Sequence, residues 1–207
     1  MIVLGLDTTG LDCSVSLVDD ATVRAHVSRN IGRGHAEVLA GMVVEAFDAA
    51  GLTPHDVDRL AVCTGPGSFT GLRVALSFAL GFALPRGLPV IGVNALYITA
   101  LDLTFTDNET KMAVYRDVRR DEVFYCEYDA GSPVGSPRAM SFESAISTAN
   151  EKNLLSVESI SADTRILAWF AMDLNPADYP PEPLYARGPD AKLPGGKSPP
   201  GQPAPTK

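Results

Sequence analysis

A glycine-rich turn near the middle of the chain carries the residue types and spacing most suited to chemistry. It reads Gly65-Pro-Gly-Ser-Phe-Thr-Gly71 and follows an apolar, partly β-branched run over residues 59–64, which predicts a buried strand. Glycine permits a tight turn, and Ser68 can cap a helix that begins near Phe69. A strand, a tight turn and a helix N-terminus bring backbone N–H groups together, an arrangement that suits an anion such as phosphate.

A second polar group ends the first predicted strand, where Asp7 and Thr8 follow the apolar residues 2–6. A carboxylate and hydroxyls at a hairpin mouth can face a bound phosphate and its metal, but Asp and Thr also stabilise ordinary turns. The glycine spacing of 65, 67 and 71 fits neither the dinucleotide fingerprint nor the P-loop, so a plain strand-to-helix turn stays equally open. The candidate residual nucleotide site comprises Asp7, Thr8, Gly65, Gly67 and Ser68.

The residue spacing gives little indication of a metal-binding site or of a catalytic nucleophile. The three histidines, His26, His35 and His55, have no ligand spacing, and no G-x-S-x-G elbow occurs. Gly67-Ser68 resembles such an elbow only superficially, because its hydroxyl is better placed to cap the following helix. The sequence therefore predicts neither a catalytic residue nor a metal site.

Composition narrows the class of protein. The 207 residues are 45% hydrophobic, enough for a sizeable core, and the net charge of −8 opposes unaided binding to a polyanion. No run approaches the roughly 18 apolar residues of a membrane span, and Asp7 interrupts the apolar start, so no signal peptide is expected. The widely spaced cysteines, two of them in apolar runs, indicate buried thiols in a reducing compartment. A cytoplasmic protein without membrane contact is expected.

The predicted strands and helices that position these residues form a first α/β lobe at 1–104. Three strands form an antiparallel start, and the order of elements is βββαβαβα. The predicted strands lie at 2–6, 13–18, 23–28, 59–64 and 89–93, and the predicted helices at 36–50, 69–84 and 94–101.

A smaller second lobe is predicted at 105–187, where apolar residues are fewer. It is expected to contain strands, a Gly/Pro/Ser loop and short helices. The strands are placed at 111–116, 122–128 and 154–157, the loop at 130–138, and the helices at 142–150 and 162–174. Residues 188–207 are rich in Pro, Gly, Lys and Ala without periodicity, which predicts a disordered tail.

The helix at 36–50 has more apolar surface than one core contact needs. Its main stripe contains Leu39, Met42, Val43 and Phe47, and further apolar residues lie off that stripe. The helix at 69–84 is apolar nearly all round. That helix is expected to be buried on most sides, and the helix at 36–50 is either buried from two sides within its own lobe or also packed on a partner.

Six segments, in order from residue 1 to about 190, resemble the TsaB family, also called YeaZ. The run from Gly65 to Arg73 is the most specific of them. The six are Ile2-Val-Leu-Gly-Leu-Asp-Thr-Thr9, Cys13-Ser-Val-Ser-Leu17, His35 with its helix, Gly65-Pro-Gly-Ser-Phe-Thr-Gly-Leu-Arg73, the hairpin 117–125, and Pro183-Leu-Tyr-Ala-Arg-Gly-Pro-Asp190. The resemblance implies an actin-like ATPase (ASKHA) fold of two lobes, each with a mixed sheet and flanking helices, the second lobe being reduced.

The resemblance also implies a function. TsaB acts in making N6-threonylcarbamoyladenosine beside the anticodon of tRNAs, together with the catalytic subunit TsaD and the ATPase TsaE. In TsaD, a related chain, a His-x-x-x-His pair binds the catalytic metal, and the matching places here are Ala95 and Thr99. Neither can replace imidazole. The chain is thus expected to be a non-catalytic dimerisation subunit without a cofactor, a homodimer when alone, that meets tRNA only through the complex.

The resemblance places the pairing surface on the two helices at 36–50 and 69–84. The residues expected to bind the partner are His35, Val38, Leu39, Met42, Val43, Phe69, Leu72, Arg73 and Leu76. Leu39→Asp or Val43→Asp is accordingly expected to abolish pairing in a chain that still folds. The alternative is a stand-alone ATP-dependent kinase or ATPase of the same fold, which would use Asp7 and the turn at 65–68 to hold phosphates. A free-standing nucleic-acid binder is disfavoured by the acidic charge balance.

Overall fold

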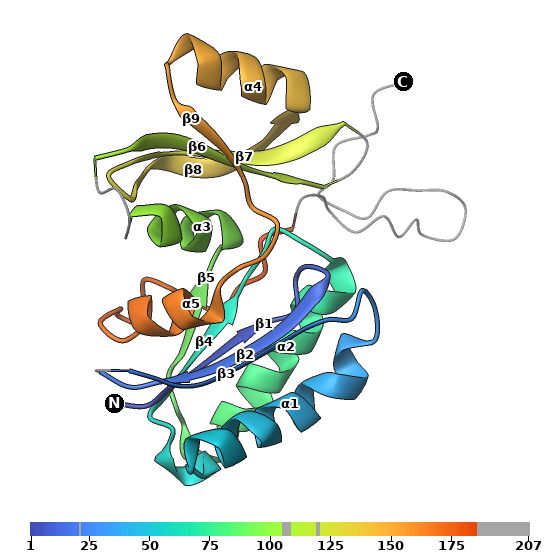
Figure 1. The fold of residues 1–207 in the computed structure, drawn as a ribbon, viewed down its shortest axis with the longest axis vertical. Coiled ribbons are helices and arrows are strands. Elements are labelled where there is room, and N and C mark those ends of the chain that lie inside the picture. The colour runs from blue at the N-terminus through green and yellow to red at the C-terminus, as the bar shows by residue number, and fades with distance from the viewer. Residues whose placement is uncertain (21, 105–108, 119–120, 186–207) are drawn as a thin grey trace.

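The computed structural model describes residues 1–20, 22–104, 109–118 and 121–185, and it folds them into two lobes stacked along the long axis (Figure 1). Each lobe contains one mixed sheet, of five strands in the first lobe and four in the second. The predicted two-lobed α/β fold is confirmed. The predicted disordered tail at 188–207 lies outside the described residues.

The first sheet has the strand order β3-β2-β1-β4-β5. Its first three strands form the predicted antiparallel meander, and β4 and β5 then run parallel to β1. Parallel strands with short apolar sequences are expected where helices cover both faces of a sheet. The bounds are β1 Val3–Asp7, β2 Asp12–Val18, β3 Val23–Asn30, β4 Arg59–Cys63 and β5 Val90–Val93.

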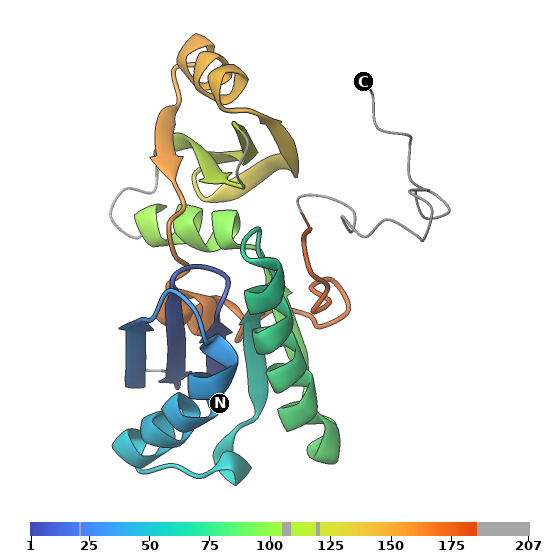
Figure 2. The same ribbon diagram turned by 90° about the vertical axis from the view of Figure 1, so that its right-hand side faces the viewer.

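Two helices, α1 (His35–Ala50) and α2 (Phe69–Ala83), lie side by side on one face of this sheet (Figure 2). The stripe predicted on the first of them faces the sheet, since Leu39, Met42 and Phe47 are buried in one core with strand residues. Gly51 ends α1 in the left-handed conformation that glycine favours. Short 3₁₀ turns at Pro54–Asp56 and Leu84–Arg86 follow the two helices.

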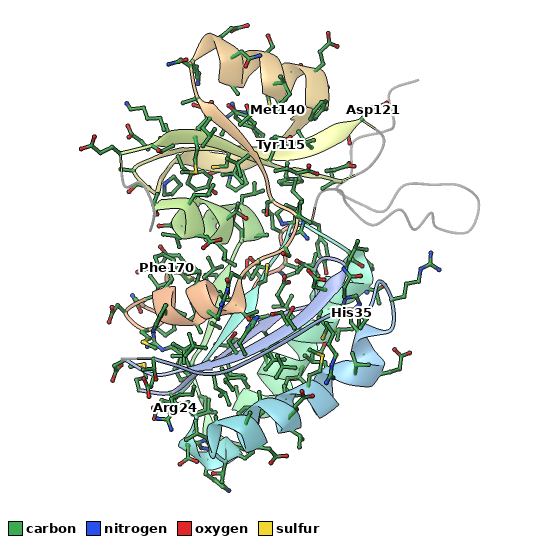
Figure 3. The ribbon with its side chains drawn as sticks, in the orientation of Figure 1. Arg24, His35, Tyr115, Asp121, Met140 and Phe170 are labelled. Atoms are coloured by element: carbon green, nitrogen blue, oxygen red, sulfur yellow. The ribbon has the colours of Figure 1, made fainter. Side chains whose placement is uncertain are left out.

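The opposite face of the first sheet is covered by α3 (Ala95–Thr104) and α5 (Thr164–Phe170). The interior positions of α5, such as Leu167 and Ala168, pack against the sheet, and Phe170 at its end meets Tyr97 of α3 edge to face (Figure 3). This corrects the predicted lobe boundaries: the helix near 162–174 belongs to the first lobe. It returns there because its apolar side fills the sheet face that α1 and α2 leave bare.

The second sheet has the order β8-β7-β6-β9, and α4 (Phe142–Glu151) covers its far side (Figure 1). The predicted loop at 130–138 is wrong: most of it belongs to an edge strand that pairs with β7. Pro133 and Pro137 are tolerated there because an edge strand has one side without ladder hydrogen bonds. The bounds are β6 Lys111–Asp117, β7 Glu122–Asp129, β8 Ser132–Ser141 and β9 Leu155–Glu158.

Two further expectations concern the described part of the chain. Cys13, Cys63 and Cys126 are buried and free, as the apolar setting of the first two predicts. Burial raises the pKa of the Cys13 thiol to about 11, and the nearby charge of Asp7 raises it further. None of the helices in the described ranges has the length and apolar character needed to cross a bilayer.

Candidate functional site

The glycine-rich turn and the β1–β2 turn meet in the structure, as the candidate nucleotide site requires. The backbone N–H of Ser68 donates to the carbonyl oxygen of Thr9 at 2.8 Å, and the Thr8 hydroxyl donates to the carbonyl oxygen of Gly71 at 2.6 Å. A Cβ atom on Gly67 or Gly71 would overlap the Thr9 or Thr8 carbonyl. Both glycines are therefore required by the close approach of two backbone segments.

The contact between these turns leaves no room for a phosphate at Asp7. Its side chain is 1% exposed, and Thr8 is completely buried. One carboxylate oxygen accepts the N–H of Thr9 at 2.8 Å, and the other accepts the N–H of Ala162 at 3.3 Å. The carboxylate is thus occupied by the chain's own backbone donors.

Arg116 closes the same place from the second lobe, and the sequence analysis missed it. It lies on β6, is buried, and donates hydrogen bonds to Oγ1 of Thr9 at 3.3 Å and to the carbonyl oxygen of Ile160 at 3.0 Å. A charged residue inside a buried strand pattern was the available signal, because such a residue must find partners across an interface.

The glycine turn itself serves the fold. Gly65 has a φ of 92°, in the region that glycine favours, and its carbonyl oxygen accepts the N–H of Ala95 at the start of α3 at 2.6 Å. Ser68 caps α2, as predicted, because its hydroxyl accepts the N–H of Gly71 at 3.3 Å. The five residues of the candidate nucleotide site are therefore brought together, but as a packed junction.

Most residues predicted to bind a partner face the chain's own interior. Those buried in the core of the first lobe or at its edge are His35, Leu39, Met42, Val43, Leu72 and Leu76. Their assignment to a pairing surface is corrected, since each of these residues is at most 8% exposed. The expected test with Leu39→Asp or Val43→Asp fails for the same reason: an aspartate there would be buried without a partner and unfold the lobe.

The outward sides of α1 and α2 also carry exposed apolar residues. Val44 on α1 is 59% exposed, and Phe69, Leu80 and Leu84 on and just after α2 are 47%, 48% and 80% exposed. Val38 is half-buried. Both helices lie on the same face of the sheet (Figure 2), and these side chains are exposed, unlike the core-facing residues of the same helices. We call Val44, Phe69, Leu80 and Leu84 the outer helical face.

One end of the outer helical face is built from two aromatic rings and a guanidinium. The Arg73 guanidinium carbon lies 3.9 Å from the centre of the Phe69 ring, and the Tyr185 ring packs on Phe69 with centres 5.2 Å apart. Arg73 Nε also donates to the Tyr185 hydroxyl at 3.4 Å. Aromatic residues and arginine are enriched at the centres of protein interfaces.

The histidine positions take structural roles. His35 donates from Nε2 to the carbonyl oxygen of Asp12 at 3.2 Å, at the start of α1 (Figure 3). Thr99 and Ala95 form one turn of α3, in which the Thr99 hydroxyl lies within hydrogen-bonding distance of the Ala95 carbonyl oxygen (3.0 Å) and of the Ser159 hydroxyl (2.8 Å). Across residues 1–20, 22–104, 109–118 and 121–185, no three His, Cys, Asp or Glu side chains are grouped to hold a metal.

A family model and individual relatives both relate this sequence to proteins of tRNA threonylcarbamoyladenosine biosynthesis. The sequence model of the family described as TsaD, tRNA N6-adenosine threonylcarbamoyltransferase, matches residues 24–165. The tRNA threonylcarbamoyladenosine biosynthesis protein TsaB of Escherichia coli is 37% identical over 128 residues, which cover 62% of this chain and 55% of that protein. An uncharacterized protein of Mycobacterium tuberculosis is 30% identical over 88% of this chain and 92% of its own length.

Solved structures agree with the sequence matches. YeaZ from Pseudomonas aeruginosa superposes with a TM-score of 0.71 at 25% identity, covering 89% of this chain and 99% of that one. The matched segment spans only about half of the Escherichia coli and Haemophilus influenzae TsaB proteins, 55% and 53% of their lengths.

Proposed function

Because this chain belongs to the TsaB (YeaZ) family, we propose that it is a non-catalytic subunit in the biosynthesis of N6-threonylcarbamoyladenosine in tRNA. In this role it binds a TsaD-like catalytic subunit and supports transfer of the threonylcarbamoyl group to the adenosine next to the anticodon. The proposal also includes cooperation with a TsaE-like ATPase, contact with tRNA only through the complex, and a cytoplasmic location.

The observation that carries the proposal is the outer helical face. Four large apolar side chains, on or next to two adjacent helices, point away from the core, and each is about half exposed or more. Exposed apolar patches of this kind mark sites of protein association. Beside the patch lie small exposed residues, Ala40 and Gly41 on α1 and Gly81 on α2, which allow another helix to approach closely.

A homodimer in the absence of the catalytic subunit follows from the same surface. A patch that is left uncovered can be buried against a second copy, and a two-fold dimer presents the same patch from both chains. Phe69, Arg73 and Tyr185 supply the anchor residues in either assembly. Val38, which is half-buried, contributes a partial contact at the edge of this surface.

Catalysis by this chain alone has weak support. The places that correspond to the metal-binding histidines of TsaD are held by Ala95 and Thr99, whose carbonyl and hydroxyl groups bond to each other. The stand-alone kinase or ATPase requires a phosphate at Asp7, which is buried and already accepts two backbone hydrogen bonds. Calorimetry with ATP and Mg²⁺ on the isolated chain distinguishes the two functions. A kinase or ATPase is expected to bind ATP with micromolar affinity and to turn it over, and the non-catalytic subunit is not.

Leu80→Asp tests the outer helical face directly. The side chain is exposed, so the variant is expected to fold with an unchanged circular dichroism spectrum and melting temperature. A charge in the centre of an apolar interface is expected to weaken binding to the TsaD-like subunit at least tenfold in calorimetry, which is about 1.4 kcal/mol. Modification of tRNA by the reconstituted complex is expected to fall in parallel.

Val134→Asp is the matched control. Val134 lies on β8 in the second lobe and is 53% exposed, so the chemical change and the exposure match those of Leu80. This variant is expected to bind the TsaD-like subunit as the unchanged chain does. Equal binding by both variants would remove the outer helical face from the proposal, and tRNA modification by this chain alone would refute the non-catalytic role.

A further inference from the structure

A cavity of about 310 Å³ lies between the two lobes. Its walls come from the carboxyl ends of β4 and β5, the first turn of α3, the edge strand β8 and the segment 179–184, called the C-terminal segment below. Lining residues from these five parts include Thr64, Asn94, Tyr97, Pro137, Tyr179 and Glu182. No part of the proposed function uses it.

The place of the cavity in the sheet favours a ligand. β1, β4 and β5 run parallel, so their carboxyl ends meet at one edge of the sheet, where ligands of α/β proteins commonly bind. At the end of β1 this edge is closed by Asp7, Thr9 and Arg116. At the ends of β4 and β5, beside Thr64 and Asn94, the edge opens into the cavity.

The C-terminal segment forms the outer wall and is held in place by backbone contacts. Gly92 on β5 donates its N–H to the carbonyl oxygen of Tyr179 at 2.9 Å, and Leu184 donates its N–H to the carbonyl oxygen of Thr64 at 2.8 Å. A Cβ atom on Gly92 would overlap the Pro180 carbonyl, so glycine is what lets the segment lie this close. One wall of the cavity is therefore held to the sheet by two backbone hydrogen bonds.

Aromatic rings form one side of the cavity. Tyr97 contacts Phe170 edge to face with ring centres 4.9 Å apart, and Phe170 contacts Tyr179 in the same way at 6.1 Å. The cluster fixes the two lining tyrosines in orientation, which lowers the entropy lost when a flat ring packs against them. Three prolines in the lining, at 137, 180 and 183, add rigid apolar surface.

The polar groups of the lining determine which hydrogen-bonding groups and which charge a ligand of the cavity can carry. Asn94 Oδ1 accepts the N–H of Tyr97 at 2.9 Å, which leaves the side-chain amide to donate to a ring nitrogen or carbonyl oxygen. The Glu182 carboxylate can accept from an amino group. Among the described lining residues there is one carboxylate and no lysine or arginine, so a phosphate group is disfavoured.

We propose that this cavity binds the base of a free nucleoside that carries an amino group, with adenosine as the representative ligand. The flat ring packs against the tyrosine and proline wall, Asn94 donates to a ring nitrogen, and Glu182 accepts from the amino group. The ribose points to solvent. Its wall residues Pro183 and Leu184 precede Tyr185, which packs on Phe69 of the outer helical face, but the inference does not rest on the proposed function.

Calorimetry on the full chain with adenosine, AMP and uridine tests the site. Adenosine is expected to bind with a dissociation constant below 1 mM, AMP at least tenfold more weakly because of Glu182, and uridine more weakly because it lacks the amino group. Oligoadenylate distinguishes a free nucleoside from a base within RNA. Tighter binding of oligoadenylate or AMP than of adenosine, or no adenosine binding at 5 mM (about five times the stated limit), overturns the proposal.

Two conservative substitutions keep the test informative. Asn94→Asp retains the side-chain oxygen that caps α3 but removes the amide donor, and Glu182→Gln changes an exposed side chain. Each is expected to weaken adenosine binding at least fivefold. Glu182→Gln removes the negative charge, so the ratio of the dissociation constants of AMP and adenosine is also expected to decrease. Glu143→Gln, an exposed glutamate on α4, is the matched control and should leave binding unchanged. Unchanged binding in both cavity variants would place adenosine elsewhere.

Discussion

The guanidinium of Arg116, in the second lobe, donates a hydrogen bond to the hydroxyl of Thr9, in the first lobe, at 3.3 Å. Thr9 in turn donates its N–H to Asp7, so a buried cation of one lobe and a buried carboxylate of the other are joined through one threonine. Arg116 also holds the carbonyl oxygen of Ile160 on the segment that links the lobes. The chain thus closes with its own groups the junction where the candidate nucleotide site was expected.

Arg116→Met is expected to lower the free energy of unfolding by about 2 kcal/mol, because two hydrogen-bond acceptors lose a charged donor in a buried place. Urea denaturation measures the loss, and hydrogen exchange at Thr9 and Ile160 should quicken. Arg24→Met is the control: its ion pair with Asp19 is on the surface (Figure 3), and a loss below about 1 kcal/mol is expected. Equal losses would mean that Arg116 does not hold the lobes together.

Gly71→Ala is expected to destabilise the isolated chain by about 2–3 kcal/mol, because the added methyl group overlaps the Thr8 carbonyl and the two turns must separate. Gly81, also on α2, has open space around its Cβ position. Gly81→Ala is therefore expected to add about 0.5–1 kcal/mol through helix propensity. Thermal and urea unfolding of both variants measure the contrast; unchanged or increased stability in Gly71→Ala would mean that the contact between the two turns does not require glycine.

Local patterns predicted most of the first lobe, since its strands and helices are regular and strongly apolar. They could not predict which side of α1 faces inward: the same stripe at Leu39, Met42 and Val43 fits a core or a partner, and only packing against the sheet decides. Val44, off the stripe, is the exposed residue. The sequence thus indicated a second apolar side correctly, but most of the residues it assigned to the partner surface are buried in the lobe.

Other features depend on partners distant in the sequence. β8 contains Gly135 and two prolines, so local propensity favours a loop, and the strand exists because β7 offers a ladder. α5 joins the first lobe through contacts some 150 residues away, such as Thr164 with Ser14 and Ser16. Arg116 likewise gains its role from the opposite lobe. No periodicity in one segment records such contacts.

Tyr128→Phe is expected to raise the free energy of unfolding by about 1 kcal/mol. The hydroxyl of Tyr128 is buried beside the Cys126 thiol, which is only a weak hydrogen-bond partner, whereas its ring, stacked on Tyr97 with centres 5.8 Å apart, is kept in the variant. Tyr125→Phe is the control, because the Tyr125 hydroxyl donates to Glu127 at 3.3 Å and its removal should cost stability. Chemical denaturation compares the two; a loss in Tyr128→Phe would reveal a stronger partner for that hydroxyl.

Stability between pH 5 and 3 is expected to depend on Glu127, a buried carboxylate of the second lobe. Burial by itself raises the pKa of Glu127, but hydrogen bonds from Lys152 at 2.8 and 2.7 Å, with help from Tyr125 and Arg138, bring that pKa below its ordinary value. As the pH falls, the Glu127 carboxylate therefore takes up a proton in the unfolded chain at a higher pH than in the folded chain. The contribution is complete above about pH 5 and is lost as the pH drops through the ordinary carboxyl range, about 4.3, toward the lower folded value.

Lys152→Met separates this contribution from general acid unfolding. The variant keeps the buried carboxylate but loses its main cation, so the unfolding free energy at pH 7 is expected to fall by about 1–2 kcal/mol. The further loss between pH 5 and 3 is expected to shrink, because the folded pKa of Glu127 moves back up toward or above the unfolded one. Lys111→Met, at an exposed pair with Asp129, should change neither quantity by more than about 0.5 kcal/mol. If Lys152→Met keeps the full loss of stability between pH 5 and 3 seen in the unchanged chain, the acid sensitivity arises from other carboxylates.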